Sequence, residues 1–109
     1  MAQLLAQRPV VSAGDVDTVS VDYTDMLDEG ETIASAATPT EVGTSNLTLG
    51  APVINASIVL IRGRSVAIGK ATEFSIQGMV AGTTYTVRVS VTTSAGRTKK
   101  HDLRIITAA

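Results

Sequence analysis

The stretch from Thr84 to Thr93, TYTVRVSVTT, constrains the fold more than any other part of the chain. Its polar residues alternate strictly with apolar ones, which are Tyr85, Val87, Val89 and Val91. Successive side chains of a β-strand point to opposite faces of the sheet, so this period places the tyrosine and the valines on a buried face. A helix would scatter the same residues around its whole circumference. The stretch therefore predicts a half-buried β-strand.

The residues after this stretch predict the second strand of a hairpin. We expect a three-residue loop, Ser94 to Gly96, with Gly96 in the left-handed conformation. The opposed pairs are then Val87–Leu103, Tyr85–Ile105 and, on the exposed face, Arg88–Asp102. A shift of the second strand by one residue would move its apolar side chains into water, and a shift by two would place two arginines opposite each other.

Size, cysteine content and charge narrow the function classes. The 109 residues form one domain that is large enough to bury a core. Without cysteine, the chain has no disulfides, no thiol catalysis and no thiolate metal site. The net charge of −1 provides no overall field to attract nucleic acid or an anionic membrane. No apolar run approaches the roughly 20 residues of a membrane span, and the first residues lack the pattern of a signal peptide.

Short apolar stretches separated by turn residues run along the rest of the chain. We expect further strands at Val19–Tyr23, Thr32–Thr38, Leu47–Leu49, Asn55–Ile61, Val66–Ile68 and Phe74–Ile76, the second of them ending at Pro39. About seven or eight short strands and no helix predict an all-β sandwich over residues 18–109. Residues 1–17, which include Pro9 and Gly14, are expected to form an extended N-terminal arm that binds a neighbour.

Charge is distributed unevenly between the two halves of the chain. Residues 1–50 carry eight acidic residues against Arg8, a balance of −7, and residues 51–109 carry eight bases against Glu73 and Asp102, a balance of +6. In one interpretation, strands from both halves interleave and the charges largely cancel. In the other, an acidic patch meets a basic patch on the next copy or on another protein. The first is favoured, because opposite charges commonly pair across strands.

The segment FSIQGMVAGTTYTVRVSVTTSAGRT, residues 74–98, resembles the last three strands of fibronectin type III and related immunoglobulin-like domains. An apolar strand is followed by an apolar corner residue, a glycine and a tyrosine that begins an alternating strand. The resemblance implies an immunoglobulin-like sandwich in which Met79 and Gly82 form the corner and the Tyr85 hydroxyl binds the backbone upstream. The tryptophan that such domains often bury is absent.

A second resemblance covers more of the chain. The segments VDYTDMLDEGETIASA, residues 21–36, and VAGTTYTVRVSVTTSAGRTKKHDLRI, residues 80–105, resemble small structural proteins of tailed phages, including the fiber–tail adaptor family. The resemblance implies a virion protein without chemistry of its own, assembled in the host cytoplasm in several symmetric copies. It would connect the tail or neck to fibers through contacts with other virion proteins. The alternative is a capsid cement or decoration protein that stabilises the head shell.

No residue pattern predicts catalysis, and we expect neither a cofactor nor a metal. His101 is the only histidine, and its neighbour Asp102 points to the opposite face of the strand, so the two cannot act as in a catalytic triad. The turn after the first expected strand contains five acidic residues: Asp22, Asp25, Asp28, Glu29 and Glu31. Their spacing is not that of an EF-hand calcium loop, so a solvated turn or a contact patch is favoured over a calcium site. The basic residues Arg97, Lys99, Lys100 and Arg104 have no aromatic residues among them of the kind on which single-stranded nucleic acid stacks, so a nucleic-acid site is not expected.

The expected function therefore rests on protein–protein contacts. The candidate interface residues come from the arm, the acidic turn and two basic stretches; they are Leu4, Leu5, Arg8, Asp25, Asp28, Glu29, Arg62, Arg64, Arg97, Lys99 and Lys100.

Overall fold

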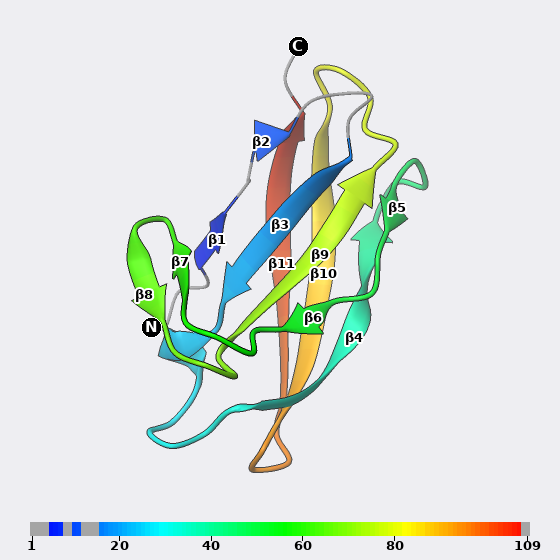
Figure 1. The fold of residues 1–109 in the computed structure, drawn as a ribbon. Coiled ribbons are helices and arrows are strands. Elements are labelled where there is room, and N and C mark those ends of the chain that lie inside the picture. The colour runs from blue at the N-terminus through cyan, green and yellow to red at the C-terminus, as the bar shows by residue number, and fades with distance from the viewer. Residues whose placement is uncertain (1–4, 8–9, 12–15, 108–109) are drawn as a thin grey trace.

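A long hairpin organises the structure. The computed structural model describes residues 5–7, 10–11 and 16–107. The hairpin consists of β10 (Thr84–Thr93) and β11 (Thr98–Thr107), which run antiparallel in Figure 1. Their register is the expected one and includes the pairs Tyr85–Ile105, Val87–Leu103 and Arg88–Asp102. Because buried and exposed residues alternate along β10, its tyrosine and valines face the interior.

The sheet that contains this hairpin has the strand order β2-β11-β10-β4. The strand β4 (Ile33–Val42) is antiparallel to β10, and β2 (Val10–Val11) runs parallel to the C-terminal end of β11. The expectation that the strand starting near Thr32 ends at Pro39 is wrong, because β4 continues to Val42. The register shifts between the pairs Arg88–Thr40 and Ser90–Ala37, which leaves one extra residue on β4. A bulge on an edge strand accommodates a proline, since no N–H is required there.

The second sheet has the order β1-β3-β9-β5. The central pair is β3 (Asp17–Asp22) with β9 (Ala71–Gln77), and β1 (Leu5–Gln7) borders β3. On the other side of β9, two short strands pair with successive stretches of it: β5 (Thr48–Leu49) and β6 (Val53–Ile54). A 3-10 turn, η1 (Thr24–Met26), follows β3.

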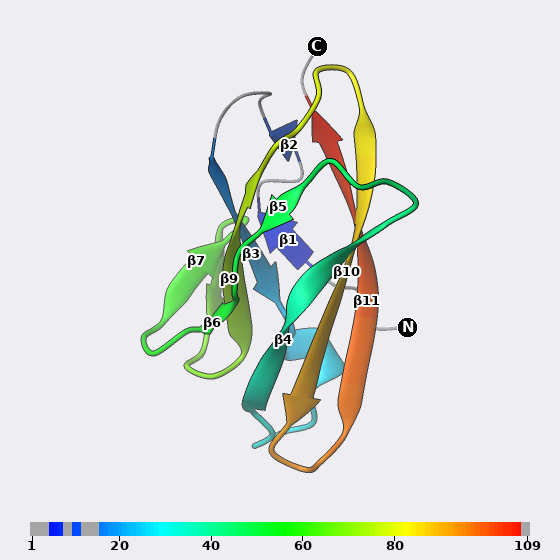
Figure 2. The ribbon, with the colours of Figure 1, turned by 90° about the vertical axis from the view of Figure 1, so that its right-hand side faces the viewer.

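The two sheets form two layers around one core, as Figure 2 shows from the side. The buried side chains of this core are Val19, Val21, Tyr23, Ile33, Phe74, Ile76, Met79, Tyr85, Val87, Val89, Val91, Leu103 and Ile105. The prediction of an all-β sandwich is thus confirmed, with eleven strands in the described part instead of about seven or eight. The relation of this sandwich to immunoglobulin-like domains, whose two sheets consist of strands ABED and CFG in the constant type, stays a prediction.

The single strand expected over Asn55–Ile61 is wrong, because the chain leaves the sheet at Asn55. The Asn55 side-chain amide donates to the carbonyls of Ser57 (3.0 Å) and Ala67 (2.8 Å). Its carbonyl oxygen accepts from the amides of Lys70 (3.1 Å) and Ala71 (3.0 Å). One side chain therefore satisfies both ends of the excursion that starts and ends beside it.

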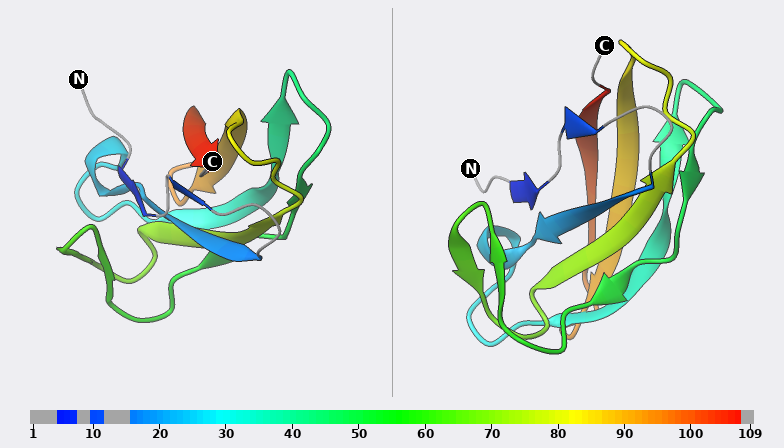
Figure 3. Two further views of the ribbon diagram at one scale, coloured as in Figure 1. Left: turned by 90° about the horizontal axis from the view of Figure 1, so that it is seen from above. Right: turned by 45° about the horizontal axis from the view of Figure 1, so that its top comes forward.

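This excursion contains a small hairpin of β7 (Val59–Ile61) and β8 (Arg64–Val66). Arg62 and Gly63 connect the strands, both at positive φ (53° and 78°). Such a two-residue turn matches the twist of a hairpin, and glycine at its second position removes half of the strain. The β7–β8 hairpin projects beside the main sandwich in both views of Figure 3.

The arm expected over residues 1–17 lies against the sandwich where the structure describes it. Leu5, Ala6 and Gln7 pair with β3, and Val10 and Val11 pair with β11, so these two stretches border both sheets. An extended backbone can pair with the free N–H and C=O groups of an edge strand even when its own sequence does not alternate between apolar and polar residues. The division into an arm, residues 1–17, and a sandwich, residues 18–109, stays a prediction. Leu4 and Arg8 lie outside the described residues, and binding of the arm to a neighbour stays a prediction.

Candidate protein–protein interface

One end of the sandwich is held by the hydroxyl of Tyr85. The Tyr85 side chain is fully buried, and its hydroxyl accepts hydrogen bonds from the backbone amide of Val80 (3.0 Å) and the side-chain amide of Asn46 (3.3 Å). Met79 is buried in the same core, and Gly82 turns the chain at a φ of 73°. Tyr85, Met79 and Gly82 thus occupy the places that the sequence assigns to a tyrosine corner.

Replacement of Tyr85 by phenylalanine should lower stability without changing the surface. The ring stays buried, whereas the Val80 amide loses its partner, at a cost of roughly 1–3 kcal/mol. For a domain of this size, each kcal/mol lowers the Tm by about 4–8 °C. Thermal unfolding measures the change. Arg88→Ala is the control, since Arg88 and Asp102 form an exposed ion pair (2.8 Å) of the kind that adds little stability. A larger loss in the control than in Tyr85→Phe would contradict the assignment.

The opposite end of the sandwich is held by a buried carboxylate. Glu31 is only 5% exposed, although the sequence places it in an acidic turn. One carboxylate oxygen accepts from the hydroxyl of Thr93 (2.6 Å) and from Nε of Arg97 (3.0 Å). The other accepts from the backbone amide of Asp28 (2.9 Å) and from a terminal nitrogen of Arg97. Both oxygens are therefore surrounded by donors, which is the environment that stabilises a charged carboxylate.

These bonds lower the pKa of Glu31 to about 2, with the Arg97 guanidinium as the main cause and the Thr93 hydroxyl as the next. The same contact joins the two sequence segments that carry the phage resemblance. Besides the Glu31–Arg97 pair, the Ser94 amide donates to the Thr32 carbonyl (2.7 Å) and the Thr32 amide donates to the Ser94 hydroxyl (3.0 Å). The acidic turn and the Ser-Ala-Gly-Arg loop thus form one structural unit.

A second ion-pair cluster anchors the β7–β8 hairpin. Both terminal nitrogens of Arg64 donate to the carboxylate of Asp25, each at 3.0 Å. Nε of Arg64 lies 3.7 Å from the buried carboxylate of Asp22. Hydrogen bonds from Arg64 lower the pKa of Asp25. The cluster therefore fixes the hairpin against the turn that follows β3.

The structure assigns several candidate interface residues to contacts inside the chain. Asp25 pairs with Arg64, and Asp28 pairs with Arg97 at 3.1 Å. Because these pairs join the acidic first half to the basic second half, part of the charge asymmetry cancels inside the domain. The remaining candidates in the described part lie in separate elements: Leu5 in β1, Glu29 in the acidic turn, Arg62 at the hairpin tip, and Lys99 and Lys100 on β11. Their contact with a partner stays a prediction.

The described residues do not form a cluster of metal ligands. No three histidine, aspartate or glutamate side chains in this part of the chain lie close enough to hold a metal ion. His101 is half-buried, and the carboxylate of Asp102 binds Arg88. No helix in the described ranges is long and apolar enough to cross a membrane.

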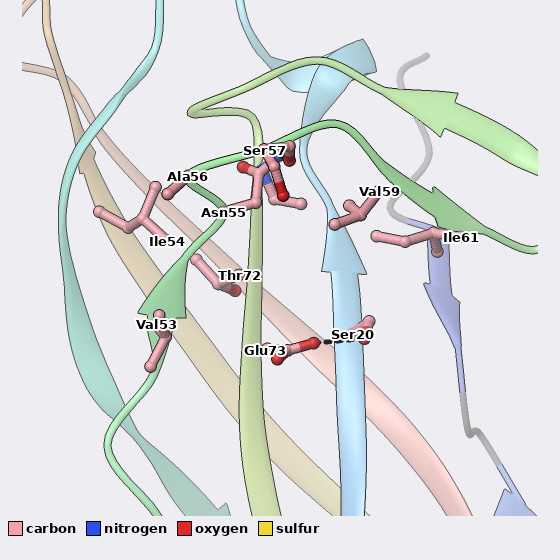
Figure 4. Close-up of a pocket in the computed structure, with 11 residues that line it drawn as sticks. Ser20, Val53, Ile54, Asn55, Ala56, Ser57, Val59, Ile61, Thr72 and Glu73 are labelled. Carbon is pink, nitrogen blue, oxygen red and sulfur yellow. Dashed lines mark hydrogen bonds between the residues drawn. The ribbon is translucent and has the colours of Figure 1, made fainter.

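A shallow apolar cavity of about 200 Å³ lies between the β6–β7 connection and the outer face of β3 and β9 (Figure 4). Its walls are mostly the apolar side chains of Val53, Ile54, Val59 and Ile61, and Ser20 and Glu73 form a hydrogen bond of 3.4 Å across its floor. Three large apolar side chains in or next to the β7–β8 hairpin are strongly exposed: Ile58 (66%), Leu60 (68%) and Ile68 (57%). Exposed apolar side chains that lie close together are typical of protein contact surfaces.

Two positions that organise the loops were missed by the sequence analysis. The Asn55 side chain joins the two ends of the segment between β6 and β9. The sequence indicates this role only by placing an asparagine between apolar residues, because an asparagine side chain can bind backbone N–H and C=O groups in a turn. Glu41 accepts from the amides of Asn46 (2.9 Å) and Leu47 (2.8 Å) and from the Thr44 hydroxyl, so it caps the turn after β4. Nothing in the spacing of Glu41 predicts that role.

Comparison with protein families identifies one match that spans most of the chain. A family model described as podophage GP4 fiber-tail adaptor protein gp77 matches residues 12–106. Comparisons with curated proteins and with solved structures find no significant match. The matched region contains both the Glu31–Arg97 unit and the Tyr85 corner, which are the parts of the sequence that resemble phage structural proteins. The chain belongs to the phage fiber–tail adaptor family.

Proposed function

We propose that this protein joins the phage tail to its fibers through protein–protein contacts and has no enzymatic activity. The observation that carries the proposal is the family match over residues 12–106, which includes both sheets of the sandwich except β1 and β2. The tail or neck would bind one side and a fiber the other, with several copies in a symmetric ring. The virion would acquire the protein during assembly in the host cytoplasm. The family match favours this role over a capsid cement protein.

The architecture supports a spacer role. A connector must transmit force and orientation, which requires that its two ends stay fixed relative to each other. The Tyr85 hydroxyl holds one end of the sandwich, and the Glu31–Arg97 pair holds the other. In a sandwich the loops gather at two opposite ends, so that two partners can bind without competing. The β7–β8 hairpin, with exposed Ile58 and Leu60, provides an apolar contact surface at the side.

Deletion of the gene tests this proposal directly. We expect particles with filled heads and tails but without fibers, as seen by electron microscopy and by the loss of fiber protein from purified particles. Complementation by the unchanged gene should restore the fibers. Leu60→Asp should restore them poorly, because it places a charge on the apolar surface of the hairpin, whereas Thr84→Asp on the polar face of β10 is the matched control. Fully fibered and infectious particles from the deletion would exclude the adaptor role.

A further inference from the structure

Most of one edge of β11 has no partner strand in the described part of the chain. On its inner side β11 pairs with β10 from Thr98 to Ile106, whereas β2 pairs only with Ile106 and Thr107 (Figure 1). Among the described residues, the edge from Thr98 to Ile105 is therefore open. An open edge strand presents a row of unpaired N–H and C=O groups that can bind another strand.

The hydrogen bonds of the hairpin determine which residues of β11 present these groups. Across the loop, the amide of Thr93 donates to the carbonyl of Arg97 (2.8 Å). Bonded and non-bonded pairs alternate in an antiparallel ladder, so the odd-numbered residues of β11 bond to β10. The even-numbered residues from Thr98 to Arg104 direct their N–H and C=O groups to the open edge. A new strand must therefore form its bonded pairs with these residues.

Charge on the exposed face makes this edge complementary to itself. The residues that face outward are Thr98, Lys100, Asp102 and Arg104, with Lys100 and Asp102 adjacent in that row. If two β11 strands pair antiparallel around His101, each Lys100 lies opposite Asp102 of the second copy. Each Thr98 then lies opposite Arg104 of the second copy. Opposite charges at directly opposed positions stabilise a strand pair, and like charges destabilise it.

We propose that two copies of this chain pair β11 with β11 around a two-fold axis at His101, so that their four-stranded sheets become one continuous sheet. All the free N–H and C=O groups from Thr98 to Arg104 find partners in this register. Asp102 then lies between Arg88 of its own chain (2.8 Å) and Lys100 of the second copy. The contact is isologous, because each copy contributes the same residues.

The neighbouring registers that keep the bonded pairs are less favourable. Pairing around Asp102 would oppose two aspartates directly and set Lys100 against Arg104. It would also require the end of β11 that β2 already occupies. Pairing around Lys100 would oppose two lysines. The charges therefore select one register, and a second copy of the chain supplies the complementary charges without any further partner. This inference concerns the isolated protein and is independent of the adaptor role.

A single cysteine tests the register, because the chain has none of its own. Residue 101 would lie opposite itself in a non-bonded pair, where the Cα atoms are about 4.5 Å apart, within the range of a disulfide. His101→Cys should therefore form a disulfide-linked dimer on mild oxidation. Lys99→Cys is the matched control, since residue 99 faces the same side but lies opposite Leu103, and it should stay mostly unlinked. Equal cross-linking of both variants, or none at residue 101, would overturn the proposal.

Charge reversal tests the energetics by analytical ultracentrifugation. The unchanged protein should dimerise reversibly at concentrations on the order of 10–100 µM, as expected for a small interface. Lys100→Glu replaces both attractive pairs with repulsive ones and should raise the dimer Kd about tenfold or more. Arg104→Glu changes the net charge equally but lies opposite Thr98 and should leave the Kd within about threefold of the original. A monomer at all concentrations, or equal weakening by both variants, would exclude this dimer.

Discussion

Replacement of Glu31 by glutamine should lower the Tm by about 10 °C or more, since it breaks a buried charged network that closes one end of the sandwich. Four donors surround the carboxylate: two from Arg97, the Thr93 hydroxyl and the Asp28 amide. Glutamine has nearly the same shape, but its NH₂ group would face donors, and the Arg97 guanidinium would keep only the exposed carboxylate of Asp28 as a counter-charge. Glutamine therefore preserves the side-chain volume and removes the negative charge.

The effect of this substitution should depend on pH in a defined direction. The pKa of Glu31 is lowered from 4.5 to about 2 in the folded protein. A carboxyl group whose pKa is lower in the folded state stabilises the fold above its unfolded pKa, and that stabilisation is lost as the pH falls. The Tm difference between the unchanged protein and Glu31→Gln should thus be full above about pH 5 and shrink between pH 4.5 and pH 2. Differential scanning calorimetry across this range measures it.

Asp28→Asn is the matched control for Glu31→Gln. Asp28 also pairs with Arg97, but its side chain is 80% exposed. Solvent screens such a pair, so the control should change the Tm by no more than a few degrees. If Asp28→Asn destabilises the protein as much as Glu31→Gln does, then the exposed pair, not the buried carboxylate, holds this end of the sandwich. A Tm difference that is independent of pH would also contradict the lowered pKa.

The sequence predicts the β10–β11 hairpin and its register because two local signals agree there. The alternation of apolar residues fixes the buried face, and Gly96, at a φ of 79°, fixes the loop length. The pair of Arg88 with Asp102 then distinguishes the register from its two-residue shift. Local chemistry determines the outcome wherever neighbours in sequence are also neighbours in the ladder.

The functions of Glu31 and Arg97 could not be predicted in the same way. Each is an ordinary charged turn residue on its own, and only the fold brings the two turns together. The phage resemblance contains both residues, in its Gly-Glu-Thr and Gly-Arg-Thr segments, but spacing along the chain does not reveal that they meet. Long-range side-chain contacts of this kind depend on topology, which the strand pattern predicts only as a class.

The same limit applies to the interruptions of the strands. Pro39 was expected to end a strand, and the structure instead accommodates it in a bulge whose position depends on the partner strand β10. The expected strand from Asn55 to Ile61 is rich in apolar residues, yet the four hydrogen bonds of Asn55 divert it into the projecting hairpin. Apolar content alone does not distinguish a buried strand from an exposed contact surface.

Gly78→Ala should be the most damaging of the small substitutions at the Tyr85 end of the sandwich. Gly78 has a φ of 88°, which residues with a side chain rarely adopt, and a Cβ there would overlap with the backbone oxygen of Asn46. Backbone cannot rotate away as a side chain can, so the Asn46 turn must shift. Since Asn46 also donates to the Tyr85 hydroxyl, the corner bond is disturbed with it. We expect a loss of about 2–4 kcal/mol, measured by urea unfolding.

Gly82→Ala separates backbone strain from the steric clash. Gly82 has a similar φ of 73°, but no atom lies within 4 Å of the position where its Cβ would be. Only the strain of a left-handed alanine remains, roughly 1–2 kcal/mol. The difference between the two variants then measures how firmly the Asn46 turn is held against the end of β9. Equal losses would mean that this turn yields freely, and the sandwich would then lack the rigid end that a connector between tail and fiber requires.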